Sequence, residues 1–169
     1  ENNNDLQLVK QVEMLYSLTN KIYTAPKFAT YTILPTTDCD ARCFYCFEHG
    51  VVKKKMSEQI ASDVGDYILR THENTKILLR WFGGEPLYNS KVIDIICTEL
   101  QKRGVEYHSH MVSNGYLFDD EMVERANDLW HLKKIQITLD GTEKIYNKIK
   151  AYIYKDVSSP FKRVIGNIE

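Results

Sequence analysis

Segments with the hydrophobic pattern of strands alternate along the chain with segments that have the 3.6-residue periodicity of helices. This order predicts strands that alternate with helices. Four short segments are rich in β-branched and aromatic residues, as strands are. They cover residues 29–35, 76–82, 106–113 and 134–139. Other segments carry apolar residues about every 3.6 positions, as on one face of a helix. The predicted helices cover residues 57–72 with Ser57 as the cap, residues 90–103 and residues 160–168. Two more begin at a cap formed by Asp119 or Asp120 and at about residue 143.

The inward faces of two helices can be assigned from the same periodicity. The helix after Ser57 is predicted to bury Ile60, Val64, Tyr67 and Ile68. The helix after Asp119 or Asp120 is predicted to bury Met122, Val123, Ala126 and Leu129. Cys97 shares a helical stripe with Ile93, Ile96 and Leu100, so it is predicted to be a core residue.

A further helix is predicted at the start of the chain, over residues 5–23. Its periodic apolar positions are Leu8, Val12, Leu15 and Ile22. Pro26 cannot continue a helix and is expected to end it. We therefore expect residues 1–27 to form an N-terminal helical arm and residues 28–169 to form the main domain.

Alternating strands and helices predict an α/β fold with parallel strands joined by right-handed βαβ units. Polar motifs stand where each predicted strand ends: residues 39–46, 83–85, 113–114 and 140. The carboxyl ends of parallel strands share one rim, where α/β proteins bind ligands. The sequence therefore predicts one binding site built from four strand ends.

The fourth predicted strand has one apolar and one polar face. Ile135, Ile137 and Leu139 alternate with Gln136, Thr138 and Asp140. The apolar face is expected to pack on helices, and the polar face to line a barrel interior or remain half exposed. His108 and His110 share a face of the third strand; a metal site is possible there, but structural histidines are expected.

Composition narrows the class of protein. The 169 residues carry a net charge of −1, so no basic field indicates nucleic-acid binding. No apolar run is long enough for a membrane span, and no secretory signal is recognisable, so we expect a cytoplasmic protein. The basic cluster Lys53–Lys55 is expected to be a solvated patch.

Three cysteines in one loop, Cys39, Cys43 and Cys46, provide the candidate chemistry. A structural zinc site needs four ligands and an ordinary [4Fe–4S] cluster takes four cysteines. Three thiols therefore suggest a cluster with one iron left for a ligand that is not protein. His49 could instead complete a Cys₃His zinc site. A disulfide or a thioredoxin-like pair is less favoured in this context.

The triplet has Tyr45 before its third cysteine and is followed by Gly83-Gly84-Glu85-Pro86. Together these motifs resemble the signatures of radical S-adenosylmethionine (SAM) enzymes. The resemblance implies a (β/α) barrel in which the three cysteines hold a [4Fe–4S] cluster. SAM would chelate the fourth iron and be cleaved to a 5′-deoxyadenosyl radical.

The same resemblance implies cofactor-binding roles for eight residues. The backbone beside Tyr45 would meet the adenine, and the Gly83-Gly84-Glu85 segment would take the amino group of SAM. The remaining positions, for the carboxylate, the sugar or the substrate, are Ser113, Asn114, Thr138 and Asp140. From the residues alone, Gly83-Gly84 and Asn114-Gly115 could also be plain turns. No catalytic acid or base can be named.

Leu139-Asp140-Gly141 resembles the SPASM-type branch, which includes peptide maturases and anaerobic sulfatase maturases, although Tyr146-Asn147 replaces the branch's usual His-Asp or His-Asn. This implies a peptide or protein substrate and an electron donor of flavodoxin or ferredoxin type. Sulfatase maturation and ribosomal-peptide maturation both remain open. The rivals outside the family are a non-catalytic Cys₃His zinc module and a chain that folds without metal.

The resemblance covers only part of the family's barrel. Four strands can be recognised, whereas the family has six βα units, so we expect an N-terminal part of a longer enzyme with a partial barrel. The fourth strand would then be a sheet edge, and we expect a dimer through this edge.

Overall fold

The computed structural model describes residues 3–24, 28–72, 75–155 and 159–169. Its strands are β1 (Phe28–Thr36), β2 (Lys76–Gly83), β3 (Tyr107–Ser113) and β4 (Leu132–Ile137). Its α-helices are α1 (Asn3–Thr24), α2 (Glu58–Thr71), α3 (Ser90–Lys102), α4 (Asp120–Asp128), α5 (Glu143–Lys150) and α6 (Pro160–Ile168), and the 3₁₀ helix η1 covers Pro86–Asn89. The predicted order of strands and helices is confirmed.

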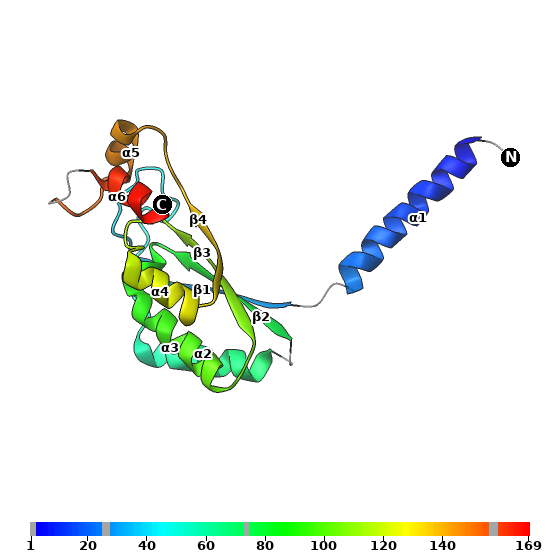
Figure 1. Cartoon of the computed structure of the whole chain (residues 1–169), viewed down its shortest axis with the longest axis horizontal. Coiled ribbons are helices and arrows are strands. Elements are labelled where there is room, and N and C mark those ends of the chain that lie inside the picture. Colours follow the sequence, from blue (N-terminus) through cyan, green and yellow to red (C-terminus); the bar gives the residue numbers. More distant parts are fainter. Residues whose placement is uncertain (1–2, 25–27, 73–74, 156–158) are drawn as a thin grey trace.

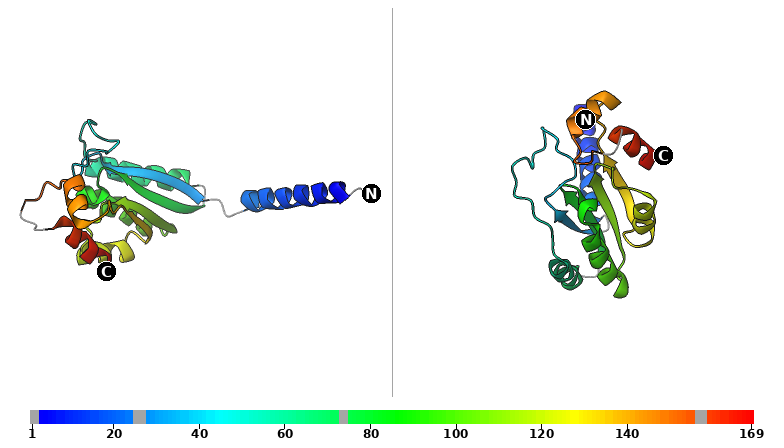
Figure 2. Two further views of the ribbon diagram at one scale, coloured as in Figure 1. Left: turned by 90° about the horizontal axis from the view of Figure 1, so that it is seen from above. Right: turned by 90° about the vertical axis from the view of Figure 1, so that its left-hand side faces the viewer.

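The four strands form one sheet in the order β1-β2-β3-β4, and every neighbouring pair is parallel. Helices α2, α3 and α4 lie along one face of this sheet, while α5 and α6 sit at its carboxyl end (Figure 1; Figure 2). The architecture is that of a partial β/α barrel, so the predicted fold class is confirmed. The parallel register brings all four strand ends to one rim.

The core lies between the sheet and helices α2 to α4. Ile77, Leu79 and Trp81 point from the inner strand β2 and are fully buried against helix residues such as Ile93 and Leu100. Each such side chain contributes about 1.5–3 kcal/mol through burial. Cys97 is also fully buried in this cluster, as its helical position predicted.

The inward face of α2 differs from the prediction. Ile68 is fully buried, but Ile60 and Tyr67 are 51% and 55% exposed. The small residues Ala61 and Gly65 take the inward positions instead, and a Cβ on Gly65 would lie 3.3 Å from the Glu99 Cβ. The two helices approach so closely that only small side chains fit between them, which hydrophobic periodicity alone does not reveal.

The second assigned helix face, on α4, is correct in part. Ala126 is buried, and Met122 and Leu129 pack against the core, whereas Val123 is 38% exposed. Both predicted caps form, since Ser57 accepts a bond from the Ile60 amide at 3.3 Å and Asp119 accepts one from the Met122 amide at 3.1 Å.

Strand β4 is shorter at its carboxyl end than predicted. Pairing with β3 stops at Ile137, opposite Ser113, because β3 itself ends there. Ile135 and Ile137 face the helices as expected, but Leu139 is 44% exposed. Thr138 and Asp140 therefore lie in the loop after the strand.

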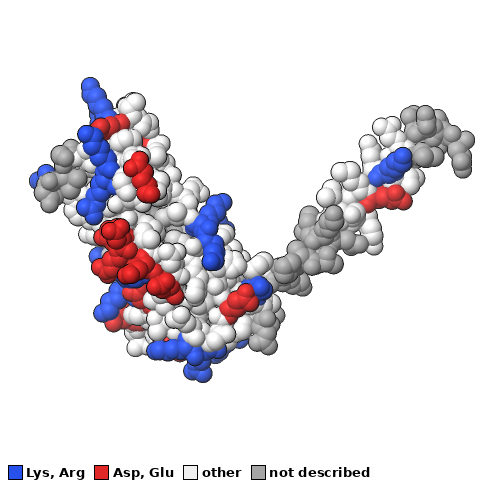
Figure 3. Space-filling view, in the orientation of Figure 1, with Lys and Arg blue, Asp and Glu red and all other residues white. Residues whose placement is uncertain are grey.

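The helix predicted at the start of the chain is confirmed as α1, which extends away from the sheet in Figures 1 and 2. Its residues Val12 and Leu15 are 57% and 63% exposed. Pro26, expected to end it, lies outside the described residues. Among the helices described here, none has the length and hydropathy needed to cross a bilayer. Acidic and basic side chains are interspersed on the visible face of the molecule (Figure 3).

Candidate functional site

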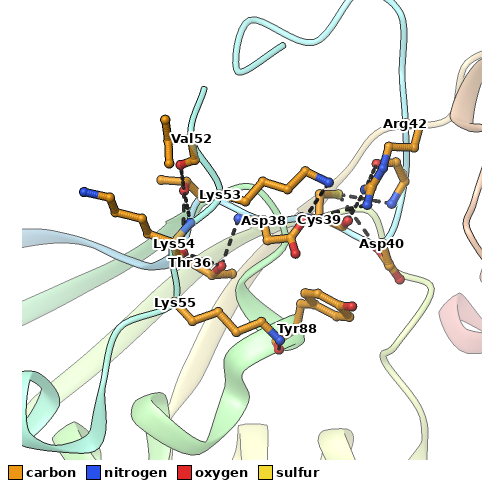
Figure 4. Close-up of polar contacts among 12 residues, drawn as sticks. Thr36, Asp38, Cys39, Asp40, Arg42, Val52, Lys53, Lys54, Lys55 and Tyr88 are labelled. Atoms are coloured by element: carbon orange, nitrogen blue, oxygen red, sulfur yellow. Dashed lines mark hydrogen bonds and ion pairs between the residues drawn. The ribbon is translucent and has the colours of Figure 1, made fainter. Parts of the chain in front are cut away.

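The cysteine loop leaves β1 at Thr36 and returns to the same strand eighteen residues later. At its neck, the Thr37 amide donates to the Lys54 carbonyl at 2.9 Å and the Met56 amide donates to the Pro35 carbonyl at 2.9 Å. Thr36 Oγ1 adds a bond of 2.8 Å to the Lys54 carbonyl (Figure 4). The loop is therefore closed at its base, and its cysteines are held above the rim of the sheet.

Cys39, Cys43 and Cys46 all line one pocket of about 170 Å³, which His49 and Gly84 also line. All three thiols are free. Burial raises the pKa of Cys39 to about 12 and also raises the pKa of Cys43 above its ordinary value. Both thiols are therefore protonated near neutral pH without metal, and binding a metal would displace their protons.

The three thiols share a pocket without forming a site for a single ion. Within the described ranges, no three His, Cys, Asp or Glu side chains converge closely enough to hold one metal ion. A tetrahedral zinc requires such convergence. A [4Fe–4S] cubane does not, because each thiolate binds a different iron at a different corner. The Cys₃His arrangement with His49 is therefore not formed, and three thiols around one pocket remain.

Gly83 and Gly84 lie against the start of the cysteine loop. A Cβ on Gly83 would lie 2.4 Å from the Thr36 oxygen, and one on Gly84 would lie 2.2 Å from the Asp38 oxygen. The Gly84 amide donates to Thr36 O at 3.1 Å, and the Glu85 amide donates to Asp38 O at 2.9 Å. The absence of side chains at Gly83 and Gly84 therefore lets the backbone after β2 pack directly on the residues just before Cys39.

Glu85 is fully buried and joins the ends of two strands. Its Oε1 accepts from Ser113 Oγ at 2.9 Å and from the Leu87 amide at 3.1 Å, and its Oε2 accepts from the Asn114 amide at 2.8 Å. Burial raises its pKa to about 7. Both oxygens of this carboxylate thus bond within the protein. Acceptance of a ligand ammonium by Glu85 stays a prediction.

Asn114 links Glu85 to the start of the cysteine loop. Its Nδ2 donates to Asp40 Oδ1 at 2.7 Å and lies 3.8 Å from Cys39 Sγ. Its Oδ1 accepts from the Tyr116 amide at 2.9 Å, so the predicted turn also forms. We call the contacts of Gly84, Glu85 and Asn114 with residues 36–40 the inner fastening of the loop.

Asp40 is a site residue that the sequence did not single out. It is fully buried, and its Oδ2 has no hydrogen-bond partner in the part of the chain that the structure describes. Its carbonyl accepts from the Ile153 amide at 2.9 Å. Burial raises its pKa. A buried, half-satisfied carboxyl beside Cys39 is typical of a site that has a further partner when it is loaded.

A second group of residues holds the other side of the loop. The Tyr45 hydroxyl donates to Asp140 Oδ2 at 2.9 Å. Lys150 Nζ lies 3.0 Å from the same oxygen and 3.2 Å from the Tyr45 oxygen. The Arg42 amide donates to the Lys150 carbonyl at 2.8 Å. We call these contacts of Tyr45, Asp140 and Lys150 the outer fastening.

Lys150 was missed by sequence reasoning, although it is only 5% exposed. Burial by itself lowers the pKa of a lysine, but the bonds to Asp140 and Tyr45 raise the pKa of Lys150 above its ordinary value. Its position four residues after buried Tyr146, on the inward face of α5, was the available signal. A lysine in the last turn of a short helix otherwise looks like a surface residue.

The structure brings some of the predicted site residues together and leaves others apart. Ser113, Asn114 and Glu85 meet at the inner fastening, and Tyr45 and Asp140 meet at the outer one. Thr138 is exposed and bonds to none of these residues within the described ranges. The basic cluster was expected to be a solvated patch, but two of its lysines also make contacts within the protein. Lys53 pairs with Asp38 at 3.1 Å, and Lys55 Nζ lies 4.0 Å from the centre of the Tyr88 ring (Figure 4).

The chain is similar to known proteins in sequence and in fold. The family model described as the radical SAM superfamily matches residues 33–166. A search of curated proteins found no match. Among solved structures, native anSMEcpe with bound AdoMet and Cp18Cys peptide superposes with a TM-score of 0.65 at 20% identity, covering 85% of this chain and 39% of that one.

A second solved structure is Streptococcus suis SuiB bound to S-adenosylmethionine, with a TM-score of 0.55 at 14% identity over 99% of this chain and 35% of that one. The chain thus spans well under half the length of the solved structures it resembles. At these identities the likeness establishes the shared fold.

Proposed function

The chain belongs to the radical SAM superfamily, and from this premise we propose that residues 28–169 bind a [4Fe–4S] cluster and SAM for radical modification of a peptide or protein. Members of this superfamily bind both cofactors. Residues 1–27 would form a helical arm outside this core. When bound, the cofactors supply a 5′-deoxyadenosyl radical that abstracts hydrogen from a substrate.

The observation that carries this proposal is the arrangement of Cys39, Cys43 and Cys46. Their free thiols line one pocket without converging on a single point. They would hold three irons of the cluster as thiolates and leave the fourth for SAM. Both fastenings limit movement of the loop, so the thiols are positioned before the cluster arrives.

The other site residues would then have distinct tasks. Gly83 and Gly84 fix the loop against the end of β2 and bring backbone groups to the rim. Asn114 orients Asp40 beside Cys39. Tyr45 is tethered through its hydroxyl, which would leave its backbone free to meet an adenine.

Ser113, Thr138 and Asp140 remain proposed contacts of the SAM carboxylate, its sugar or the substrate. Ser113 is 5% exposed and bonded to Glu85, so its contribution would come through the backbone. Asp140 is already held by Tyr45 and Lys150. Thr138 is exposed on the loop after β4 and is free to reach a ligand.

A peptide substrate is supported by the peptide bound in the anSMEcpe structure. The likeness to anSMEcpe and to SuiB leaves sulfatase maturation and ribosomal-peptide maturation as two versions of this proposal. The SPASM-type branch, a flavodoxin or ferredoxin as reductant, a cytoplasmic location and pairing of two chains through β4 are part of the same proposal.

The test is anaerobic reconstitution with iron and sulfide, followed by reduction with SAM present. The protein should bind about four irons per chain and release 5′-deoxyadenosine. Cys43→Ala should lose both properties, whereas Cys97→Ala, which removes a core thiol outside the loop, should keep them. Equal product from wild type and Cys43→Ala would overturn the proposal, as would one bound zinc per chain.

A further inference from the structure

A row of basic side chains crosses the face of the sheet that α2 to α4 leave uncovered. The strand register places Thr32 beside Arg80, Arg80 beside His110 and His110 beside Lys134. Because side chains alternate between the two faces of a sheet, these four residues share one face, opposite to buried Leu79 and Trp81. Three of the four carry or can carry positive charge.

The row lines a hollow of about 420 Å³. Its walls include all four residues of the row together with Phe82, Val112 and Gln136. Arg80 and Lys134 are exposed and His110 is half-buried. The hollow therefore has basic groups on its floor and aromatic and apolar groups beside them, a combination found where proteins bind ligands with both a charged and an apolar part.

Among the described residues, no acidic side chain forms an ion pair with Arg80 or Lys134. Like charges on neighbouring strands destabilise a sheet. Burial lowers the pKa of His110, and nearby His108, Lys134 and Arg80 lower it further. This repulsion would be relieved by an anion placed over the row.

The row is connected to the cysteine loop through aromatic residues. Phe82 lies two residues after Arg80 on the same face, directly before Gly83. Its ring stacks on Phe47, which follows Cys46, with ring centres 6.0 Å apart. The Phe47–Phe82 contact thus links one wall of the hollow to the cysteine loop, and a peptide lying in the hollow would reach toward the loop.

We propose that Arg80, His110 and Lys134 bind the carboxylate of an acidic side chain in the peptide substrate. The guanidinium of Arg80 can bond a carboxylate through two parallel N–H groups, and Lys134 adds a second charge from the next strand but one. The inference rests on the proposed function only in identifying the occupant as substrate. Carboxylate binding itself requires neither cluster nor SAM.

The experiment uses a pair of blocked tripeptides, acetyl-Gly-Glu-Gly-amide and acetyl-Gly-Gln-Gly-amide, which differ by a single carboxylate. The readout is the pKa of the His110 ring measured by NMR during titration with each peptide. The glutamate peptide should raise the pKa of His110, because a nearby negative charge favours the protonated ring. The glutamine peptide should leave it unchanged.

Two variants test whether Arg80 and Lys134 bind the carboxylate. Arg80→Gln combined with Lys134→Gln should weaken binding of the glutamate peptide about tenfold or more, since charge-assisted bonds are lost. Lys102→Gln, a charge removal on the exposed side of α3, should have no effect. Equal binding of the two peptides overturns the proposal, and so does equal binding by wild type and the Arg80/Lys134 double variant.

Two further outcomes separate this inference from the proposed function. A pKa of His110 that is already raised without peptide would show that the protein supplies its own anion, which overturns the inference. Cys43→Ala should still bind the glutamate peptide. If SAM cleavage fails while the peptides are discriminated, the proposed function fails and carboxylate binding by this row stands.

Discussion

The two fastenings of the cysteine loop differ in construction. The inner one uses backbone groups of Gly84 and a fully buried Glu85, and it lies in the packed region where β2 and β3 end. The outer one uses the side chains of Tyr45, Asp140 and Lys150 at the edge of the molecule. We infer that the inner fastening supports both the fold and the site, whereas the outer one supports mainly the loop.

The largest effect is expected from Gly84→Ala at the inner fastening. The added methyl group would lie 2.2 Å from the Asp38 oxygen, which cannot withdraw without breaking its bond from the Glu85 amide. The free energy of unfolding should fall by about 3 kcal/mol or more. Chemical denaturation measures this change, and cluster binding should be lost with it.

Gly166→Ala is the matched control, because nothing lies within 4 Å of the added methyl group. In helix α6 it should be neutral or stabilise by roughly 0.5 kcal/mol. If Gly84→Ala behaves like this control, the loop is not held by the Gly84 backbone.

Glu85→Ala should have the next largest effect. It leaves the Leu87 and Asn114 amides and the Ser113 hydroxyl without their acceptor, at a cost of about 2–3 kcal/mol in unfolding free energy. Glu106→Ala, whose side chain is 71% exposed, should change stability by less than about 0.5 kcal/mol. Similar thermal unfolding of the two variants would contradict the role of Glu85.

Lys150→Met tests the outer fastening. It leaves Asp140 beside Tyr45 without its cation and should cost about 2 kcal/mol. Hydrogen exchange should become faster in residues 42–46 while the amides of β2 keep their protection. Lys148→Met, an exposed neighbour on α5, should leave both regions unchanged. Equal acceleration in β2 would mean that the two fastenings do not differ as inferred.

A pH titration sharpens the comparison further. Since burial raises the pKa of Glu85 to about 7, above its ordinary value of 4.5, the folded state holds a proton that the unfolded chain releases between these values. The stabilisation from this group is fully present below pH 4.5 and is lost as the pH rises through 7. The stability difference between wild type and Glu85→Gln should therefore depend on pH across this window, and a constant difference would refute the assignment.

The smallest effect is expected from Lys53→Gln. Its pair with Asp38, at 3.1 Å, is half exposed to solvent and should contribute less than about 1 kcal/mol. The loss should shrink further at high salt. A change as large as that in Gly84→Ala would show that the neck of the loop, rather than the inner fastening, holds the cysteines.

The parts of this molecule that depend on short stretches of sequence could be predicted. Strands, helices, two helix caps and the cysteine triplet each follow from residues close together in the chain. Strand β4 was predicted two residues too far along the chain, since its end is set by where β3 stops. The prediction that Ile60 faces inward on α2 was wrong. The close approach of α3 instead favours a face that contains Gly65.

The parts that depend on distant residues could not be predicted. Lys150 meets Tyr45 from 105 positions away, and its spacing from Tyr146 on α5 gives no sign of that partner. Glu85 was recognised by its motif, yet two of the three groups that bond to its side chain come from the end of β3. Motifs identified the residues of this site, whereas their contacts depend on how the strand ends meet.

The central claim is that three thiols hold a cluster whose fourth iron is open to SAM. The most direct measurement is the electron paramagnetic resonance spectrum of the reduced, reconstituted protein before and after SAM is added. The account predicts a [4Fe–4S] signal that changes when SAM binds, and no such signal in Cys43→Ala. A spectrum that SAM leaves unchanged, or a protein that takes up one zinc in place of iron, would contradict it.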